Sequence, residues 1–346
     1  GVEVVASDMS LSIQILGQGL EWGGKDLASV FAQKRNLLYP PFYRMLLDIM
    51  RFNKNAQSLL SLCENSTQIT LRDLLEEQKF SAEMRDWYIV PMAAAIWSTP
   101  AEKILDFPAA TFLRFCINHH LLQVEGRPQW KTVKGGARVY VEKMLAEISE
   151  KSLDCAVLSA TRQPTGVLLT TEKGDFKFDK VLFATHADQT LKILKDASEM
   201  ENKILSQFHF QKNQAIVHLD SSFLPQRKKI WSAWNYVSSP DQKNVSVSYL
   251  INQLQPLPTT LPVLVTLNPH KPVAQDLLLK TISYHHPVFT PDSIAAQSQM
   301  DQIQGRNNTF FAGAWMGYGF HEDGLKAALR VAQVLKLNIP WSVVYE

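Results

Sequence analysis

The stretch that most constrains the fold lies near the carboxyl end: "FFAGAWMGYGFHEDGLKAALRVAQVL", from Phe310 to Leu335. It begins as an apolar strand, breaks into a glycine-rich turn and continues as a helix. The apolar residues of this helix share one face, which predicts a buried stripe: Leu325, Ala328, Leu329, Ala332 and Leu335. The first turn of a helix offers N–H groups and a positive dipole end, which stabilise an electron-rich ligand. The pattern is that of a ligand cradle, although an ordinary strand-to-helix connection has the same spacing.

A second strand-to-helix junction lies in "KVLFATHADQTLKIL". Its strand, Val181 to Ala184, is wholly apolar, so we expect it to be covered on both faces. Residues 207–285 alternate apolar and polar side chains, as half-exposed antiparallel strands do. We therefore predict an α/β plus α+β fold with two lobes. In this fold residues 134–200 and 305–338 pack together as one discontinuous domain.

The amino-terminal third predicts a hairpin followed by helices. Residues 10–24 have the pattern of two short strands around a G-x-G turn, and no amphipathic helix follows Gly24 as a dinucleotide-binding loop would require. From residue 26 to about 122 we expect helices, one of them capped by Thr70 and Asp73. "CAVLSATRQPTGVLLTTEKGDFKFDKVLFAT" predicts a three-stranded meander with turns at Q-P-T-G and K-G-D.

Composition excludes several classes of function. The chain has 346 residues, of which 46% are hydrophobic and 20% charged, as in globular proteins. Its net charge of +2 gives no electrostatic support for nucleic-acid binding. Cys63, Cys116 and Cys155 show neither metal-ligand spacing nor a disulfide framework, and no H-E-x-x-H occurs, so we expect no metal site. No apolar run approaches the roughly 20 residues that span a bilayer.

Several strings resemble one known superfamily. "FFAGAW…GFHEDGLKAA" is similar to the closing flavin motif of the amine oxidase, protoporphyrinogen oxidase and phytoene desaturase superfamily. "KVLFATHADQTLKIL" resembles its strand–turn motif, and "VKGGARVYVEKML" resembles its glycine-rich helix entry. More narrowly, "NLLYPPFYRMLLDIMRFN", "VPMAAAIWSTP" and "RPQWKTVKGGARVYV" resemble a group of predicted FAD-binding oxidoreductases that are encoded beside, or fused to, cyclopropane fatty acid synthases.

The resemblance implies a two-lobed, FAD-dependent, amine-oxidase-like fold. Residues 1–133 and 201–304 would form a mixed helical and antiparallel-sheet substrate domain, and residues 134–200 and 305–346 a discontinuous FAD domain. The positions that it implies for FAD contacts are Val157, Thr185, Gly135, Gly136, Gly313, Phe320, His321, Glu322, Asp323, Gly324 and Leu325. The aromatic residues that it suggests for the substrate pocket are Trp97, Trp130, Trp315 and Tyr318. Core packing is the alternative for Trp97 and Trp130, and no catalytic residue is identified.

One large part of the superfamily pattern has no counterpart in this sequence. The superfamily begins with a βαβ unit that carries G-x-G-x-x-G and holds the ADP half of FAD. The sequence begins at Gly1 and contains no such unit. We therefore expect a chain that lacks the amino-terminal part of the fold and does not retain FAD by itself. Ala314 also stands where the superfamily often has glutamate after F-A-G.

Two functions follow from the resemblance. The first is a FAD-dependent oxidoreductase that transfers hydride between flavin and an apolar, lipid-like substrate. The alternative is non-catalytic: a truncated remnant, or a scaffold for a cyclopropane-synthase-like, lipid-modifying methyltransferase partner. A dehydrogenase that uses only nicotinamide is disfavoured because no complete Rossmann unit is present. We expect a cytoplasmic location, with peripheral association to a membrane left open.

Overall fold

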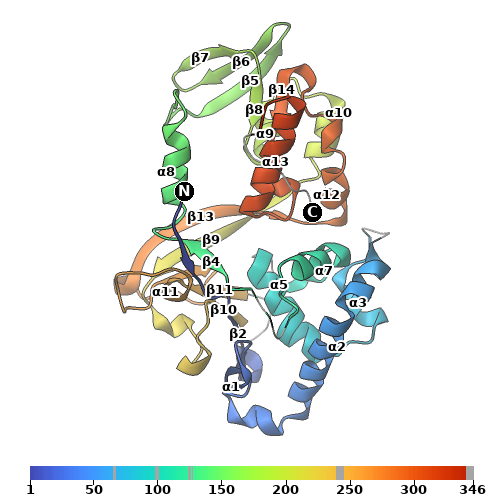
Figure 1. Ribbon diagram of the computed structural model, residues 1–346, viewed down its shortest axis with the longest axis vertical. Helices are drawn as coiled ribbons and strands as arrows, with labels where there is room; N and C mark the ends of the chain where they lie inside the picture. The colour runs from blue at the N-terminus through green and yellow to red at the C-terminus, as the bar shows by residue number, and fades with distance from the viewer. Residues whose placement is uncertain (65–67, 98–100, 124–125, 127, 239–244, 340–346) are drawn as a thin grey trace. The chain divides into compact units, whose positions relative to one another are not determined.

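The computed structural model describes residues 1–64, 68–97, 101–123, 126, 128–238 and 245–339 (Figure 1). The chain divides into two compact units, each built from two separate segments. The first unit comprises Gly1–Ser149 and Lys212–His285, and the second comprises Glu150–Gln211 and His286–Glu346. The boundaries thus fall at 150, 212 and 286 rather than at 134, 201 and 305. Residues 134–149 belong to the first unit because they follow directly on β4 (Lys131–Val133), which pairs with β1 (Val4–Ala6).

A seven-stranded sheet forms the centre of the first unit, with the strand order β13-β9-β12-β11-β10-β2-β3. Its strands are β2 (Leu11–Ile15), β3 (Leu20–Gly23), β9 (His209–His218), β10 (Trp234–Ser238), β11 (Val245–Leu250), β12 (Leu264–Leu267) and β13 (Leu278–Val288). β2 and β3 form the predicted hairpin, which turns at Gly19 with φ +57°. β2 also pairs in parallel with β10, so the hairpin is part of the main sheet.

In the described part of the chain, the first unit has helices throughout residues 26–122, as predicted, and two more outside this range, α8 and α11. They are α1 (Leu27–Val30), α2 (Pro40–Cys63), α3 (Leu71–Glu77), α4 (Ala82–Met84), the π-helix η3 (Arg85–Ile89), α5 (Val90–Trp97), α6 (Ala101–Ile104), α7 (Ala109–Asn118), α8 (Arg138–Ala146) and α11 (Ile251–Leu254). Thr70 and Asp73 form the predicted capping box at the start of α3. Among the described residues, no helix is long and apolar enough to cross a membrane.

Both faces of the central strands are buried, so the expectation of half-exposed strands is wrong for β10 and β11. One face packs against the helices through Ile13, Tyr236 and Val247. The other face carries a row of polar side chains that are at most 1% exposed: Ser12, Asn235, Ser248, Thr266 and His218. These side chains alternate with apolar ones and bond to one another across the strands. Alternation therefore reflects a buried polar row here, and not a face in contact with water.

The second unit contains the predicted meander and a separate pair of parallel strands. The meander consists of β5 (Val157–Gln163), β6 (Gly166–Thr171) and β7 (Gly174–Phe178), and the parallel pair of β8 (Val181–Phe183) and β14 (Thr309–Phe311). The helices are α9 (Ala187–Ile193), α10 (Glu199–Leu205), α12 (Pro291–Gln297) and α13 (His321–Val334). Short 3₁₀ turns complete the two units: η1 (Leu16–Gln18), η2 (Lys34–Leu38), η4 (Ser221–Phe223), η5 (Lys228–Ile230), η6 (Gln275–Leu277), η7 (Met300–Gln302), η8 (Arg306–Asn308) and η9 (Ala314–Met316).

Two expectations for the second unit are wrong. β8 is not covered on both faces, because Leu182 is 48% exposed while Phe183 is buried. The predicted stripe on α13 is wrong for Leu325 and Ala328, which are exposed, while Leu329 is buried and Leu335 packs against the core as predicted. Ala327 and Val331, outside the predicted stripe, also pack in the core. Both α13 faces carry apolar side chains, so spacing alone does not decide which one faces the core.

Candidate functional site

The candidate site lies where the two parallel strands of the second unit end. Thr309, Phe310 and Phe311 of β14 align with Val181, Leu182 and Phe183 of β8. The Ala312 amide donates to the Phe183 carbonyl over 2.9 Å. Thr185 and Gly313 therefore follow strands whose carboxyl ends share one edge. Ligands of open parallel sheets bind outside this edge.

Trp315 joins the two strand ends. Its indole Nε1 donates to the Thr185 carbonyl over 3.1 Å, and its ring meets Phe208 edge-on at 4.6 Å between centroids. The ring is 4% exposed and belongs to the core of the second unit. A Cβ at Gly313 would lie 2.3 Å from this Nε1. Gly313 is thus needed for the close approach of Trp315, a residue suggested from sequence for the substrate pocket.

The glycine-rich turn between β14 and α13 is held by specific hydrogen bonds. The Gln297 side-chain amide donates to the carbonyls of Trp315 (3.0 Å) and Gly317 (2.8 Å). A Cβ at Gly317 would lie 2.4 Å from Asp323 Oδ1, and Gly319 has φ +93°, which favours glycine. The turn is therefore an ordered structure that fixes where α13 begins.

The amino terminus of α13 offers fewer hydrogen-bond donors than an open helix end. The amides of Asp323 and Gly324 both bond the Phe320 carbonyl, at 3.1 and 3.2 Å. The half-buried Asp323 carboxylate accepts the Phe320 amide over 3.0 Å, and Glu322 adds an exposed acidic side chain. A Cβ built on Gly324 meets nothing within 4 Å. This terminus therefore has space beside Gly324 but two carboxylates that disfavour an anion.

The other predicted site residues are divided between the two units. Within the second unit, Val157 pairs with Thr171 at the start of β5, Tyr318 lies in the glycine-rich turn, and His321 is the first residue of α13. The remaining residues belong to the first unit: Gly135 and Gly136 precede α8 with φ +81° and +84°, Trp97 is buried against Phe107 at 4.6 Å, and the Trp130 ring lies parallel to His119 at 6.3 Å. Trp97 thus packs in the core, which was the alternative to a place in the substrate pocket.

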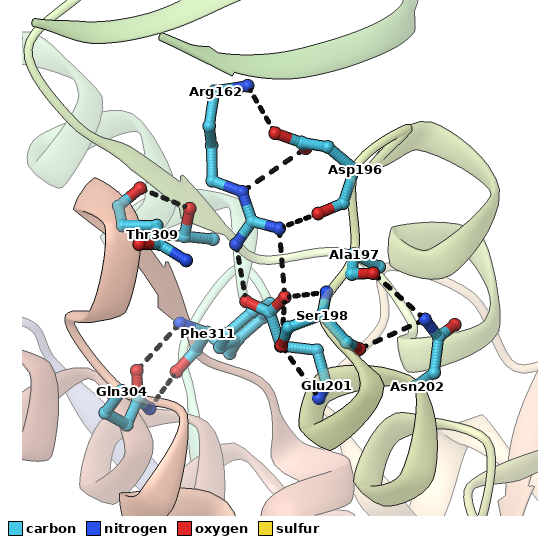
Figure 2. A network of polar contacts seen from close by, with 10 residues as sticks. Arg162, Asp196, Ala197, Ser198, Glu201, Asn202, Gln304, Thr309 and Phe311 are labelled. Carbon is cyan, nitrogen blue, oxygen red and sulfur yellow. Dashed lines mark hydrogen bonds and ion pairs between the residues drawn. The ribbon is translucent and has the colours of Figure 1, made fainter. Parts of the chain in front are cut away.

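Sequence reasoning missed a buried charged cluster in the second unit (Figure 2). Arg162 of β5 donates to both carboxylate oxygens of Glu201, at 2.7 and 3.0 Å, and to Asp196. The side chains of Arg162 and Glu201 are 7% and 2% exposed. Burial alone would lower the pKa of Arg162, but its hydrogen bonds and the charges of Glu201 and Asp196 raise the pKa overall. The cluster ties β5 to α10, and its groups are fully paired, which indicates a structural role.

Gln304 is a second residue that the sequence did not single out. Its side-chain amide bonds both backbone groups of Phe311: Oε1 accepts the N–H over 2.9 Å and Nε2 donates to the carbonyl over 2.6 Å (Figure 2). Because Ala312 bonds β8, these Phe311 groups lie on the opposite edge of β14. Gln304 thus takes the place of a neighbouring strand. Among the described residues, no three His, Cys, Asp or Glu side chains are placed to hold a metal ion.

Comparison with known proteins identifies the fold. No family model matches the chain, and no curated protein matches it by sequence. The chain is similar to the crystal structure of a CLA-producing fatty acid isomerase from P. acnes, with a TM-score of 0.64, 12% identity, and coverage of 95% of this chain and 80% of that one. It is also similar to wild-type putrescine oxidase bound to putrescine, with a TM-score of 0.67, 11% identity and coverage of 97% and 83%. A third similar structure is cyclohexylamine oxidase from Brevibacterium oxydans IH-35A, with a TM-score of 0.64, 14% identity and coverage of 97% and 83%.

These similarities extend over nearly the whole chain, while sequence identity is low. They establish that the chain has the amine-oxidase-like fold that the sequence motifs implied.

Proposed function

We propose that this protein is a FAD-dependent oxidoreductase that transfers hydride between the flavin and an apolar, lipid-like substrate. The observation that carries the proposal is the junction of β8, β14 and α13, where two parallel strands end and α13 begins with open space beside Gly324. Strand ends of this kind are ligand sites in open α/β sheets. The similar structures include a fatty acid isomerase as well as oxidases of amines, which is consistent with a lipid-like substrate.

The residues at the junction fit one part of FAD better than another. A Cβ on Gly324 would meet nothing within 4 Å, which would leave room for a flat, uncharged ring edge, and Thr185 and Gly313 follow the two strands that end at the same sheet edge. Glu322 and Asp323 disfavour a phosphate at this helix end. We infer that α13 holds the flavin ring, which supplies the hydride chemistry when bound. The protein's own contribution is to orient this ring and to exclude water.

The diphosphate of FAD needs another partner, for which the second edge of β8 is the candidate that we consider. The Phe183 carbonyl bonds Ala312, so the backbone groups of Leu182 face away from β14. β8 has one strand neighbour among the described residues. We propose that a βαβ unit with a glycine-rich turn pairs with this edge and holds the diphosphate.

A flavin titration tests the proposal. Riboflavin and FAD are titrated into the purified 346-residue chain and binding is followed by flavin fluorescence. We expect weak and similar affinities for both flavins, because only the ring is recognised. Gly324→Val should lower the affinity by about tenfold or more, since a branched side chain would occupy the open space. The matched control is Ala328→Val, an exposed position one turn further along α13.

Gly324 itself has ordinary helical geometry, so the variant acts through space and not through the backbone. Equal binding by Gly324→Val and the parent protein would contradict the site. Failure of every flavin to bind would favour the non-catalytic alternative.

A further inference from the structure

The first unit exposes a cluster of apolar side chains at the corner where η2 leads into α2. Leu38 is 90% exposed, Leu47 66% and Met50 63%. Leu38 and Leu47 line one continuous surface with Leu37, Pro40 and Tyr43. Tyr43, Leu47 and Met50 are spaced at i, i+4 and i+7, so they form one stripe along the helix. We call these six residues the apolar corner. Patches of this kind on otherwise ordinary surfaces mark interaction sites.

The apolar corner is held rigidly by the groups around it. The Tyr43 hydroxyl donates to the Leu37 carbonyl over 2.9 Å, which ties η2 to α2. Arg35 donates to the carbonyls of Gln18 (2.8 Å) and Gly19 (2.7 Å) of the neighbouring hairpin turn. The Tyr39 ring stacks on Trp87 at 6.1 Å. These contacts fix the backbone that carries the exposed leucines, so the apolar corner can bind a partner without rearranging.

Positive charge surrounds the apolar corner. Residues 34–54 contain five basic side chains (Lys34, Arg35, Arg44, Arg51 and Lys54) and one acidic side chain, Asp48. The net charge of the whole chain is only +2, so the excess of positive charge is concentrated here. Glu83 pairs with Arg44 over 3.1 Å and Asp48 pairs with Arg51 over 2.9 Å. The charges of Lys34, Arg35 and Lys54 still leave the surface positive. Two copies of this surface would repel each other, while an anionic surface would be attracted to it.

We propose that the apolar corner docks the protein on the surface of a bilayer that carries anionic headgroups. Leu38, Leu47 and Met50 enter the boundary between headgroups and acyl chains, and Tyr43 lies at the headgroup level. Lys34, Arg44 and Lys54 bind the headgroup phosphates while their alkyl stems lie along the apolar surface. This inference is independent of flavin binding, since it rests on the first unit alone.

Vesicle sedimentation tests the apolar contribution. The 346-residue chain is mixed with vesicles of phosphatidylcholine and phosphatidylserine, or of phosphatidylcholine alone. We expect binding to the mixed vesicles that weakens as salt increases. The double variant Leu38→Ser, Leu47→Ser should bind at least about tenfold more weakly, because two apolar side chains no longer enter the bilayer. The control is Leu62→Ser, which is 60% exposed on the same helix but outside the corner.

Two further measurements complete the test: the binding of charge-reversal variants and the oligomeric state of the serine variants. Lys34→Glu with Lys54→Glu should abolish the preference for phosphatidylserine, whereas Lys280→Glu, on an exposed part of β13, should not. The proposal is overturned if the parent chain ignores mixed vesicles, or if the serine variants bind them equally well. It is also overturned if the serine variants instead dissociate an oligomer seen by size-exclusion chromatography, because the corner would then be a contact between copies.

Discussion

The residue that contributes most clearly to the stability of the second unit is Arg162. Arg162→Leu leaves the Glu201 carboxylate, 2% exposed, without its cationic partner. We expect the free energy of unfolding to fall by about 3–5 kcal/mol, measured by urea denaturation. The control is Lys192→Leu, which removes an exposed ion pair with Asp188 and should cost less than about 1 kcal/mol. Equal effects of the two variants would show that the buried pair is not important for stability.

His218 makes the stability of the first unit depend on pH. Its Nδ1 accepts the Asp220 amide over 3.1 Å, so the proton is on Nε2, which donates to Thr266 over 2.7 Å. Burial lowers the pKa of His218 below 6.5, although the nearby Asp220 charge opposes this shift. The folded state therefore binds a proton less readily than the unfolded state. The free energy of unfolding should fall as pH drops below about 6.5 and be constant above it, as far as this group contributes.

Urea denaturation across this pH range checks the prediction. His218→Gln should flatten the dependence, which for one proton reaches at most about 1.4 kcal/mol per pH unit. His270, whose pKa is lowered by burial and by Lys271, lies against the same Phe223 ring and should keep part of the dependence. A pH profile that is unchanged in His218→Gln would contradict the assignment.

At the residue scale, the sequence predicts local pairs and misses distant ones. The Thr70–Asp73 capping box was found because its partners are three residues apart. Ser198 and Glu201 form the same motif, which pattern reading could have found. The partner of Glu201 could not be found in this way, because Arg162 lies 39 residues away and meets it only in the folded chain.

At the element scale, the outer edge of β14 depends on Gln304. Gln304→Leu leaves the buried N–H and carbonyl of Phe311 without partners, at a cost of about 1–3 kcal/mol for each group. We expect a lower urea midpoint with an unchanged m-value. The control is Gln302→Leu, two residues earlier and exposed. If both variants were equally stable, water would have to replace the Gln304 amide.

Elements were predicted more reliably than their environments. Apolar runs predicted β8 and α13 correctly as a strand and a helix, but not which sides are buried. Leu182 is exposed while Phe183 is buried, so only one face of β8 is covered, and this depends on what packs against the sheet and not on the strand itself. Along β10, the partner strands decide that Asn235 is buried, since its amide bonds Ser12 and the Ser248 carbonyl.

At the scale of the whole molecule, the resemblance predicted the fold class, and the strand ends of Thr185 and Gly313 do meet within one unit. The contacts that hold the candidate site in place could not be predicted from the sequence. Gln297 of α12 donates hydrogen bonds to the glycine-rich turn, and nothing in the sequence connects α12 with this turn. The space beside Gly324 likewise depends on the packing of α13, which the helix pattern left undecided.

The second unit also has exposed apolar side chains on the β5-β6-β7 meander. Phe176 and Phe178 of β7 are 43% and 48% exposed, with their rings stacked at 6.5 Å. Their partners on β6, Leu169 and Val167, pack in the core, so the meander extends past the core it covers. The unpaired edge of β8 is a template for pairing with another chain, and exposed apolar side chains favour association as well.

We therefore predict that the 346-residue chain self-associates and purifies without bound FAD. Self-association should decrease in Leu182→Lys, because a charge at the open edge disfavours strand pairing, and persist in the control Leu337→Lys, at a position 59% exposed beyond α13. Light scattering measures the self-association, and flavin absorbance measures the FAD that remains bound after purification.

A polypeptide that supplies a G-x-G-x-x-G strand–helix–strand unit to the unpaired edge of β8 should remain monomeric and retain FAD, because the helix of that unit provides the phosphate donors that α13 lacks. If the 346-residue chain by itself bound one FAD and stayed monomeric, FAD binding would not need a βαβ unit paired with the edge of β8, and the proposal for this edge would be wrong.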